Sequence, residues 1–360
     1  MKVEKNKVSI KPEATIGETM QFINDNEFGI ALVVDGEGRL MGTVTDGDIR
    51  RALLSGKTMD ADIAGVMKKN PIVVPQSMTG KSIAELMRIN GIYHLPVIDS
   101  SGKLVHLESE RIYGAIKESL TAFIMAGGEG MRLRPLTENI PKPMLKVAGR
   151  PLLEIIIDLL KAHGFKNIIL NIRYLGDIIE DYFKDGGDFG VNIKYITEPK
   201  PMGTAGSLSL LEKDEIPEDP FIVMNADILT GLNFKAFFDF HCAAKYDFTL
   251  CGRPYKVKIP FGYPIIEGDT VRDFREKPEF THLVNSGIYC ISPSLIEHIP
   301  RDENFNMPSL IKKACQEGKR VGVFPLQEKF HEIGRIETYK EAEKFYHEEM
   351  ALSYINRQKK

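Results

Sequence analysis

After residue 120, apolar residues fall into short runs that alternate with segments of helical periodicity. The runs predict strands, at residues 121–125, 168–172, 191–196 and 221–225. Between and after them, apolar residues three or four positions apart predict helices, at residues 152–163, 175–184, 204–211 and 234–244. Such alternation predicts an α/β fold with a mostly parallel sheet that is covered on both faces.

The first third of the chain contains an internal repeat. Residues 31–40 (ALVVDGEGRL) and 95–104 (LPVIDSSGKL) each contain an apolar strand, a turn with Asp and Gly, and a second strand. Helical patterns flank both copies, at residues 16–24, 48–54, 80–90 and 110–116. The repeated unit is therefore β-α-β-β-α with a period of about 64 residues, and two copies fill residues 1–118.

Composition narrows the class of protein. A length of 360 residues predicts two or three domains, and a hydrophobic fraction of 43% is enough for sizeable cores. Because Lys and Arg (47) nearly balance Asp and Glu (50), no basic field favours nucleic acid as a partner. No apolar run reaches the length of a membrane span, and the N-terminus has no apolar leader. We therefore expect a cytoplasmic protein with no membrane partner.

The four cysteines are far apart and lack the spacing of metal ligands. We expect all of them to be buried free thiols in a reducing compartment: Cys242, Cys251, Cys290 and Cys315. At the end of the chain, residues 337–355 have the pattern of an amphipathic helix that closes the domain or serves a partner chain.

A glycine-rich turn directly follows the first predicted strand of the α/β region. Residues 126–137 read AGGEGMRLRPLT, and residues 142–145 read KPML. The turn has three glycines and is followed by three cations: Gly127, Gly128 and Gly130, then Arg132, Arg134 and Lys142. Glycines let backbone N–H groups approach phosphate oxygens, and the cations supply charge for a polyphosphate. The alternative for such a loop on its own is a tight turn with solvated arginines.

This string resembles the fingerprint of sugar-1-phosphate nucleotidyltransferases, GGxGxRLxPLT followed by KPM. The resemblance implies a Rossmann-like nucleotide-diphospho-sugar transferase domain over residues 120–360. It also implies transfer of a nucleoside monophosphate from a nucleoside triphosphate to a sugar 1-phosphate, with release of pyrophosphate. The residues implied to bind the triphosphate are Ala126, Gly127, Gly128, Gly130, Glu198, Gly203 and Thr204. Arg132 and Lys142 are expected to stabilise the α-phosphate and the departing pyrophosphate.

Glu198, followed by Gly203 and Thr204, lies in a stretch that resembles the family's base-recognition segment. Relatives that act on thymidine or uridine triphosphates usually carry Gln at this position. A carboxylate only accepts hydrogen bonds, and guanine offers two adjacent donors, so Glu198 favours GTP. The alternatives are a solvated loop acid at Glu198, and a uridylyl- or thymidylyltransferase.

Asp227 follows the predicted strand 221–225, where the resemblance implies an Mg²⁺ ligand. Oxygen ligands suit this ion, which usually takes one or two carboxylates together with phosphate oxygens. The family's second carboxylate lies in a segment that ends in Asp-Ile-Gly, but residues 330–335 read FHEIGR. Glu332 is therefore the expected second ligand, His331 is unassigned, and Asp227 alone remains an alternative. A helix N-cap is the non-metal alternative for Asp227.

A third group of residues resembles the family's sugar-phosphate segments. Lys277, in Glu276-Lys277-Pro278, is expected to contact the sugar's phosphate and to act as the third catalytic cation. Glu276 is expected to accept hydrogen bonds from hexose hydroxyls, and Gly262 to let backbone approach the ring. Asn285 lies in the corresponding Asn-x-Gly strand.

The N-terminal repeat resembles a tandem pair of CBS domains, at about residues 1–57 and 58–118, a module that commonly binds adenine nucleotides. In such a site Thr45 would bind a phosphate and Asp48 the ribose hydroxyls. The alternative is an ordinary helix cap. The second copy departs from the motif, because residues 107–111 read LESER, and Glu108 and Glu110 would repel a phosphate. We therefore expect at most one nucleotide site.

The combination of both modules resembles enzymes that make GDP-linked amino sugars. Glucosamine 1-phosphate is therefore the favoured acceptor, and mannose or heptose 1-phosphate are the alternatives. A rival from another class is a nucleotide-responsive regulatory protein whose transferase half is inactive, for which Glu332 is the only support. Because CBS pairs often associate, we expect a homo-oligomer.

Overall fold

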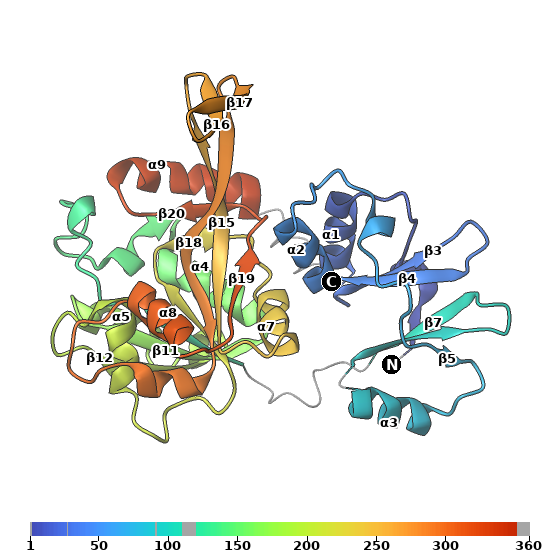
Figure 1. The fold of residues 1–360 in the computed structure, drawn as a ribbon. Coiled ribbons are helices and arrows are strands. Elements are labelled where there is room, and N and C mark those ends of the chain that lie inside the picture. The colour runs from blue at the N-terminus through green and yellow to red at the C-terminus, as the bar shows by residue number, and fades with distance from the viewer. Residues whose placement is uncertain (1, 27, 91, 110–119, 351–360) are drawn as a thin grey trace. The chain divides into compact units, whose positions relative to one another are not determined.

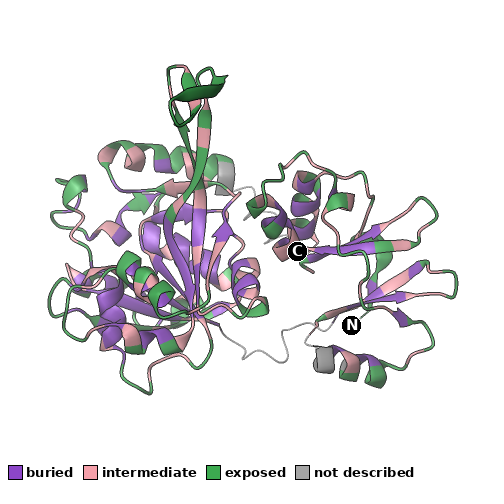
Figure 2. Ribbon diagram, in the orientation of Figure 1, coloured by how far each residue is buried: buried purple, intermediate pink, exposed green. Residues whose placement is uncertain are grey.

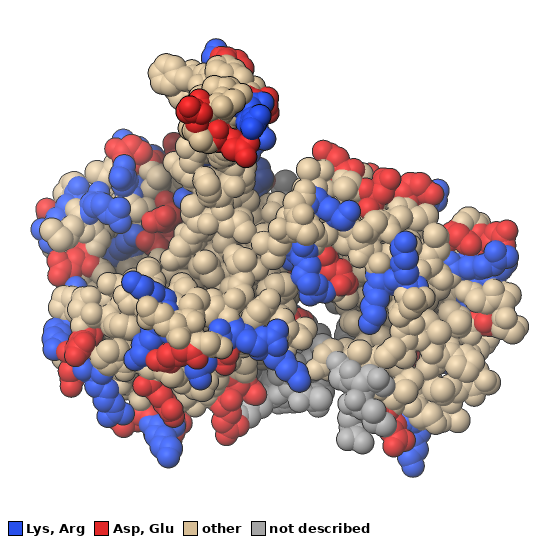
Figure 3. Space-filling view, viewed as in Figure 1, with Lys and Arg blue, Asp and Glu red and all other residues tan. Residues whose placement is uncertain are grey.

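The structure is a computed structural model that describes residues 2–26, 28–90, 92–109 and 120–350. The chain divides into two compact units, Met1–Ser119 and Leu120–Lys360, each with its own buried apolar clusters. No helix in the described residues has the length and apolar character needed to cross a membrane. On the face drawn in Figure 3, acidic and basic side chains are interspersed within each unit.

The first unit consists of two similar halves (Figure 1). Each half has a short strand, a helix, and a hairpin whose first strand runs parallel to the short one. The first half contains β2 (Ser9–Ile10), α1 (Ile16–Asp25), β3 (Ile30–Val34), β4 (Leu40–Thr45) and α2 (Asp46–Leu54). The second contains β5 (Val74–Pro75), α3 (Gly80–Asn90), β6 (His94–Ile98) and β7 (Leu104–Ser109). The predicted repeat is confirmed, and its last helix, at 110–116, lies outside the described residues.

The repeated Asp of each hairpin turn has a clear structural role. Asp35 accepts hydrogen bonds from the backbone N–H groups of Glu37 and Arg39, at 2.9 and 2.8 Å. Asp99 does the same for residues 101 and 103 in the second copy. These bonds stabilise the ionised carboxylate, and the pKa of Asp35 is lowered mainly by the bond from Arg39.

The two turns also bond to each other. Leu40 donates its N–H to the carbonyl of Gly102, and Leu104 donates to that of Gly38, at 3.1 and 2.9 Å. In addition, β1 (Lys2–Glu4) pairs with β7 of the second half. Backbone pairing therefore joins the two halves at more than one place.

The second unit is built around a twisted sheet that contains seven strands within residues 120–350 (Figure 1). Its order is β12 (Asn192–Thr197), β11 (Phe165–Ile172), β8 (Leu120–Met125), β13 (Phe221–Asn225), β18 (Glu279–Ile291), β15 (Phe248–Lys258) and β19 (Val321–Pro325). The first four are parallel to one another, β15 and β19 are parallel, and β18 is antiparallel to both its neighbours. This confirms the mostly parallel α/β fold.

The helices described in this unit are α4 (Leu152–Ala162), α5 (Gly176–Phe183), α6 (Gly203–Gly206), α7 (Phe234–Ala243), α8 (Met307–Gln316) and α9 (Ile336–Phe345). Four of them pack on this sheet through their buried apolar residues (α4, α5, α7 and α8), whereas the short α6 contacts α8 and the helix α9 contacts β20 (Phe330–Glu332). The short α6 continues as a 3₁₀ turn to Leu210, where one longer helix was predicted. The C-terminal helix, α9, continues as a π-helical turn, Tyr346–Met350. Phe123, Phe221 and Phe248 are fully buried, and the central strands are purple in Figure 2.

Three short ribbons complete the second unit. They pair β9 (Lys146–Val147) with β10 (Arg150–Pro151), β14 (Ile228–Thr230) with β20 (Phe330–Glu332), and β16 (Tyr263–Glu267) with β17 (Thr270–Arg275). The last forms the tip of an arm, defined here as residues 253–284, in which β15 and β18 continue past the sheet as an exposed ladder (Figures 1 and 2).

The prediction that all four cysteines are buried is wrong for two of them. Cys251 and Cys290 are buried free thiols in the sheet, but Cys242 on α7 and Cys315 on α8 are exposed free thiols. Both exposed residues lie on helices that have a solvent-facing side, which sequence spacing alone does not reveal.

Candidate active site

The glycine-rich loop lies at the carboxyl ends of four parallel strands. Backbone bonds connect these ends: Ala126 N–H to Asn171 O (2.8 Å), Ala226 N–H to Met125 O (3.2 Å) and Glu198 N–H to Ile172 O (2.9 Å). In sheets of this kind, ligands bind beyond the carboxyl ends of the strands. The glycine-rich loop, Glu198 and the segment that contains Asp227 therefore meet at one edge.

The loop glycines differ in what surrounds them. Gly130 has a φ of +62°, and a Cβ there would lie 3.0 Å from Thr137 Cγ2 and 3.2 Å from Lys142 Cβ. A Cβ on Gly127 would lie 3.3 Å from Arg173 Cβ, whereas no described atom lies within 4 Å of a Cβ on Gly128. Gly130 and Gly127 thus allow the loop to pack on the protein, and the open side at Gly128 leaves room for a ligand.

Lys142 and Asp227, 85 residues apart in sequence, form an ion pair. Lys142 begins a 3₁₀ turn with Pro143 in its first positions, and Asp227 directly precedes β14. Their side chains are 14% and 16% exposed, so the pair is partly desolvated. Among the described residues, Asp227 Oδ1 has no hydrogen-bond partner, although it is buried. The structure thus brings a predicted cation and a predicted metal ligand into contact.

Glu332 lies on the strand next to Asp227. Ile228 pairs with Glu332 in the β14–β20 ribbon, and Ile333 N–H donates to Asp227 O at 2.9 Å. The partnerless Oδ1 of Asp227 suits a hard cation, which takes one or two protein carboxylates, and Glu332 lies on the paired strand. The described residues contain no cluster of three or more His, Cys, Asp or Glu side chains with metal-binding geometry.

The structure also shows the surroundings of Asp227 and His331. Asp227 precedes a strand, so it is not a helix N-cap. His331, unassigned from sequence, pairs through Nε2 with Thr338 O at 2.7 Å and stacks on Phe345 with a centroid distance of 5.1 Å. It holds α9 in place.

Arg132 lies beside this carboxylate segment. A Cβ built on Gly334 would lie 3.4 Å from Glu332 Oε1 and 4.0 Å from Arg132 Nη2. Arg132 also lines a cavity of about 280 Å³ together with Arg335 and the first turn of α9. Arg335 is not among the predicted site residues, because it follows the Glu-Ile-Gly string without belonging to a motif.

Glu198 is 8% exposed, so it is not a solvated loop acid. Its Oε1 accepts a hydrogen bond from Asn171 Nδ2 at 2.8 Å, and Oε2 lies 3.7 Å from Arg173 Nε. Further along this segment, Gly203 has a φ of +78° and the Thr204 hydroxyl accepts from Met307 N–H at 2.9 Å. Thr204 therefore fixes the start of α8.

A second cavity, of about 520 Å³, lies at the base of β18. Hydroxyl, amide and carboxylate groups line it, including those of Thr204, Asn225, Asn285, Tyr289, Asn306 and Glu332. Asn285 is oriented by two bonds: its Nδ2 donates to Tyr289 Oη at 2.8 Å, and its Oδ1 accepts from Gly287 N–H at 2.9 Å. Such a lining suits a ligand with several hydroxyl groups.

The structure does not bring the other predicted sugar-phosphate residues into this cavity. Gly262 and Glu276 are neighbours on the arm, where a Cβ on Gly262 would lie 3.2 Å from Glu276 Oε2. Lys277 is exposed and precedes β18. Asn285 lies six positions after Glu279 on one continuous strand, about 20 Å away at the usual rise per residue. Lys142, Asp227 and Arg132 therefore gather at one edge, whereas Lys277 lies on the arm.

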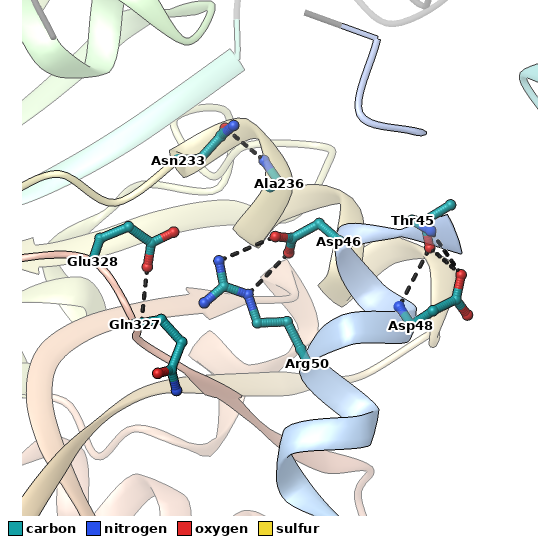
Figure 4. Close-up of polar contacts among 8 residues, drawn as sticks. All are labelled: Thr45, Asp46, Asp48, Arg50, Asn233, Ala236, Gln327 and Glu328. Carbon is teal, nitrogen blue, oxygen red and sulfur yellow. Dashed lines mark hydrogen bonds and ion pairs between the residues drawn. The ribbon is translucent and has the colours of Figure 1, made fainter. Parts of the chain in front are cut away.

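In the first unit, Thr45 and Asp48 form a capping box at the start of α2 (Figure 4). Thr45 N–H and Oγ1 donate to Asp48 Oδ2 at 2.9 and 2.7 Å, and Arg51 pairs with Asp48 Oδ1 at 2.6 Å. The helix-cap alternative is thus observed. In the second copy, Glu108 pairs with His106 at 3.2 Å, and residues 110 and 111 lie outside the described residues.

Comparison with known proteins gives a consistent result for both units. A family model for nucleotidyl transferases matches residues 121–349, and a CBS-domain model matches residues 3–55 and 61–107. The UTP–glucose-1-phosphate uridylyltransferase of Synechocystis is 29% identical over 241 residues, which cover 62% of each chain. The mannose-1-phosphate guanylyltransferase of Mycobacterium tuberculosis is 36% identical over 185 residues, which cover 50% of this chain and 51% of that protein.

The chain thus spans less than two thirds of the length of these curated relatives. The solved structure of HddC from Yersinia pseudotuberculosis is similar to 63% of this chain and 99% of that one, with a TM-score of 0.50 and 28% identity. Because the family match covers most of the chain, from β8 to the π-helical turn after α9, the prediction from the loop motif is confirmed. The chain belongs to the sugar-1-phosphate nucleotidyltransferase family and carries a pair of CBS domains before its transferase domain.

Proposed function

We propose that the second unit transfers GMP from GTP to a hexose 1-phosphate. A phosphate oxygen of the sugar attacks the α-phosphorus, the bond from that phosphorus to the bridging oxygen breaks, and pyrophosphate leaves with the bonding electrons. The attacking oxygen is already anionic, so no side-chain base is needed. The observation that carries the proposal is the contact between Lys142 and Asp227 at the edge of the sheet where the glycine-rich loop begins.

In this reaction the protein aligns two polyanions and offsets charge on the five-coordinate phosphorus. Lys142 is partly desolvated, which strengthens its attraction for phosphate oxygens. Arg132, on the neighbouring cavity, is the second cation for the departing pyrophosphate. Lys277 would reach the acceptor's phosphate only from the arm.

Asp227 and Glu332 are the residues that would hold Mg²⁺. When bound, the ion would supply additional positive charge to phosphate oxygens. Asp227 Oδ2 orients the Lys142 ammonium, and Oδ1 remains available as a hard oxygen ligand.

The choice of GTP depends on Glu198, whose buried carboxylate accepts two hydrogen bonds from a base edge only if that edge carries two donors. The name of the Mycobacterium relative supports a guanylyltransferase, and that of the Synechocystis relative keeps uridylyl transfer as the second candidate. Mannose 1-phosphate and glucosamine 1-phosphate are the first acceptors to test.

For the first unit, the proposal is a nucleotide-sensing module that binds an adenine nucleotide at the start of α2. Because Thr45 Oγ1 donates to Asp48, a ligand there would have to replace that contact. A homo-oligomer through this module is part of the same proposal.

The test is pyrophosphate release by the full chain with each of the four ribonucleoside triphosphates and dTTP, against a panel of hexose 1-phosphates, with and without AMP or ATP. We expect release with GTP and at least one hexose 1-phosphate. No release with any pair would support the non-enzymatic alternative, and release only with UTP or dTTP would replace GTP.

A further inference from the structure

Glu198 belongs to a largely buried group of polar side chains that no sequence motif indicates. We call this group, which consists of Asn171, Arg173 and Glu198, the Glu198 cluster. Asn171 lies near the end of β11 and is 2% exposed, Arg173 directly follows β11, and Glu198 directly follows β12. Since β11 and β12 are parallel neighbours, their carboxyl ends bring the three side chains together.

The contacts within the cluster fix the orientation of the carboxylate. Asn171 Nδ2 donates to Glu198 Oε1 at 2.8 Å, and the Arg173 guanidinium lies on the side of Oε2, with Nε at 3.7 Å. Arg173 Nη2 also pairs with Glu129 in the glycine-rich loop at 3.2 Å. A Cβ on Gly127 would lie 3.4 Å from Glu198 Oε2, so the cluster packs directly against the loop.

Two atoms of the cluster are costly to bury. Asn171 Oδ1 and Arg173 Nε have no hydrogen-bond partner among the described residues and are excluded from solvent. Asn171 turns its amide nitrogen toward Glu198 because a carboxylate offers only acceptors, which leaves Oδ1 facing away. Partnerless buried polar atoms are rare. A cluster with two of them is therefore better explained by a functional requirement for one orientation of Glu198 than by a contribution to the stability of the fold.

We propose that Asn171 and Arg173 are positioning residues that hold Glu198 as a two-oxygen acceptor and thereby set the preference for guanine over uracil or thymine. This inference rests on the proposed function. With Asn171 on one oxygen and Arg173 beside the other, each carboxylate oxygen keeps a lone pair for a base. Guanine presents two adjacent donors, N1–H and N2–H. Uracil presents one donor next to a carbonyl oxygen, which the second carboxylate oxygen repels.

The decisive variant is Asn171→Asp, which replaces the donor to Glu198 by a carboxylate at nearly the same place. Two carboxylates this close either turn apart or share one proton, and in both cases Glu198 no longer presents two charged oxygens to a base. We expect the ratio of kcat/KM for GTP to that for UTP to fall at least tenfold, mainly through a higher KM for GTP. We expect kcat with saturating GTP to stay within about threefold, because Lys142 and Asp227 are unchanged.

The matched control is Asn192→Asp, the same change on the adjacent strand, where exposed Asn192 contacts Asn167 at 3.2 Å. It should leave the ratio unchanged. Because Asn171 is buried, a second pair of variants protects the test from misfolding. Arg173→Ala should lower the ratio, and Arg173→Lys, which keeps the charge, should retain most of it.

Calorimetric titration with GTP and with UTP, without sugar phosphate, gives a readout independent of turnover. We expect Asn171→Asp to weaken GTP binding at least tenfold and to leave UTP binding nearly unchanged. If Asn171→Asp and Arg173→Ala keep the wild-type GTP to UTP ratio, the inference is wrong even though the proposed function stands. If the wild-type chain does not distinguish the bases, the GTP assignment itself fails.

Discussion

Replacing Lys142 with Ala tests the proposed function at its centre. The ammonium lies in a partly desolvated contact with Asp227, where a charge-assisted bond to a phosphate oxygen has its full strength. Such a bond contributes about 1.5–3 kcal/mol. Because Lys142 would strengthen its contact as charge develops on the phosphorus, we expect kcat to fall at least 100-fold, which corresponds to about 2.7 kcal/mol of lost transition-state stabilisation.

The same change also affects stability, and this has to be measured separately. Asp227 Oδ1 is already without a partner in the described structure, so removal of Lys142 leaves both carboxylate oxygens unpaired. We expect a loss of about 1–3 kcal/mol, the usual cost of a buried group that loses its partner. Lys142→Met keeps much of the side-chain volume, so it separates the loss of charge from the loss of packing.

The assay is pyrophosphate release at saturating GTP and sugar 1-phosphate, together with a thermal melt of each variant. Lys194→Ala is the control, because Lys194 pairs with Glu215 at 2.7 Å and is half exposed. That pair contributes at most about 1 kcal/mol, and the control should keep wild-type turnover. Near-wild-type kcat in folded Lys142→Ala would refute the role given to Lys142.

Three further predictions concern other parts of the chain. His241 is buried, and burial lowers its pKa to about 4, so the unfolded chain binds a proton that the native state excludes. Stability should therefore fall as the pH drops from about 6.5 to 4, by up to about 1.4 kcal/mol per pH unit. Urea titrations of His241→Asn at several pH values should show a shallower fall in the free energy of unfolding as the pH drops. The same pH dependence as in the wild type would count against this role of His241. Gly130→Ala should destabilise the second unit more than Gly164→Ala, because both have positive φ (about 1 kcal/mol) but only Gly130 has neighbours within 4 Å. Equal melting shifts would contradict this. Thr45→Ala should cost about 1 kcal/mol through the lost cap of α2, and Thr45→Ser should restore it. If Thr45→Ala and Thr45→Ser have the same melting temperature, the cap contributes little to stability.

The four parallel strands β8, β11, β12 and β13, the glycine-rich turn and the repeat were predictable because their signals are local. An apolar run such as β13 specifies a buried strand by itself, and the loop needs only consecutive glycines and cations. The repeat places Asp35 and Asp99 at equivalent positions, and both turns use the same side-chain bonds.

What could not be predicted depends on register and on side-chain environment. The Glu198 cluster forms only because β11 and β12 pair so that Ile172 lies beside Thr197. The arm was missed because its strands mix aromatic with charged residues and are exposed on both faces, so no alternation of hydrophobic and polar positions marks them. For the same reason, the sequence order of Gly262, Glu276 and Asn285 did not reveal how far along β18 the last of them lies.

Because β1 adds to the sheet of the second half, the two halves of the first unit cannot be separated by cutting the chain between them. A protein shortened by its first five residues would leave the edge of β7 open, with unpaired backbone groups from His106 to Glu108. A fusion partner attached directly before Lys2 would crowd that same edge. Truncation therefore cannot isolate one repeat for binding studies without creating an exposed strand edge that favours aggregation.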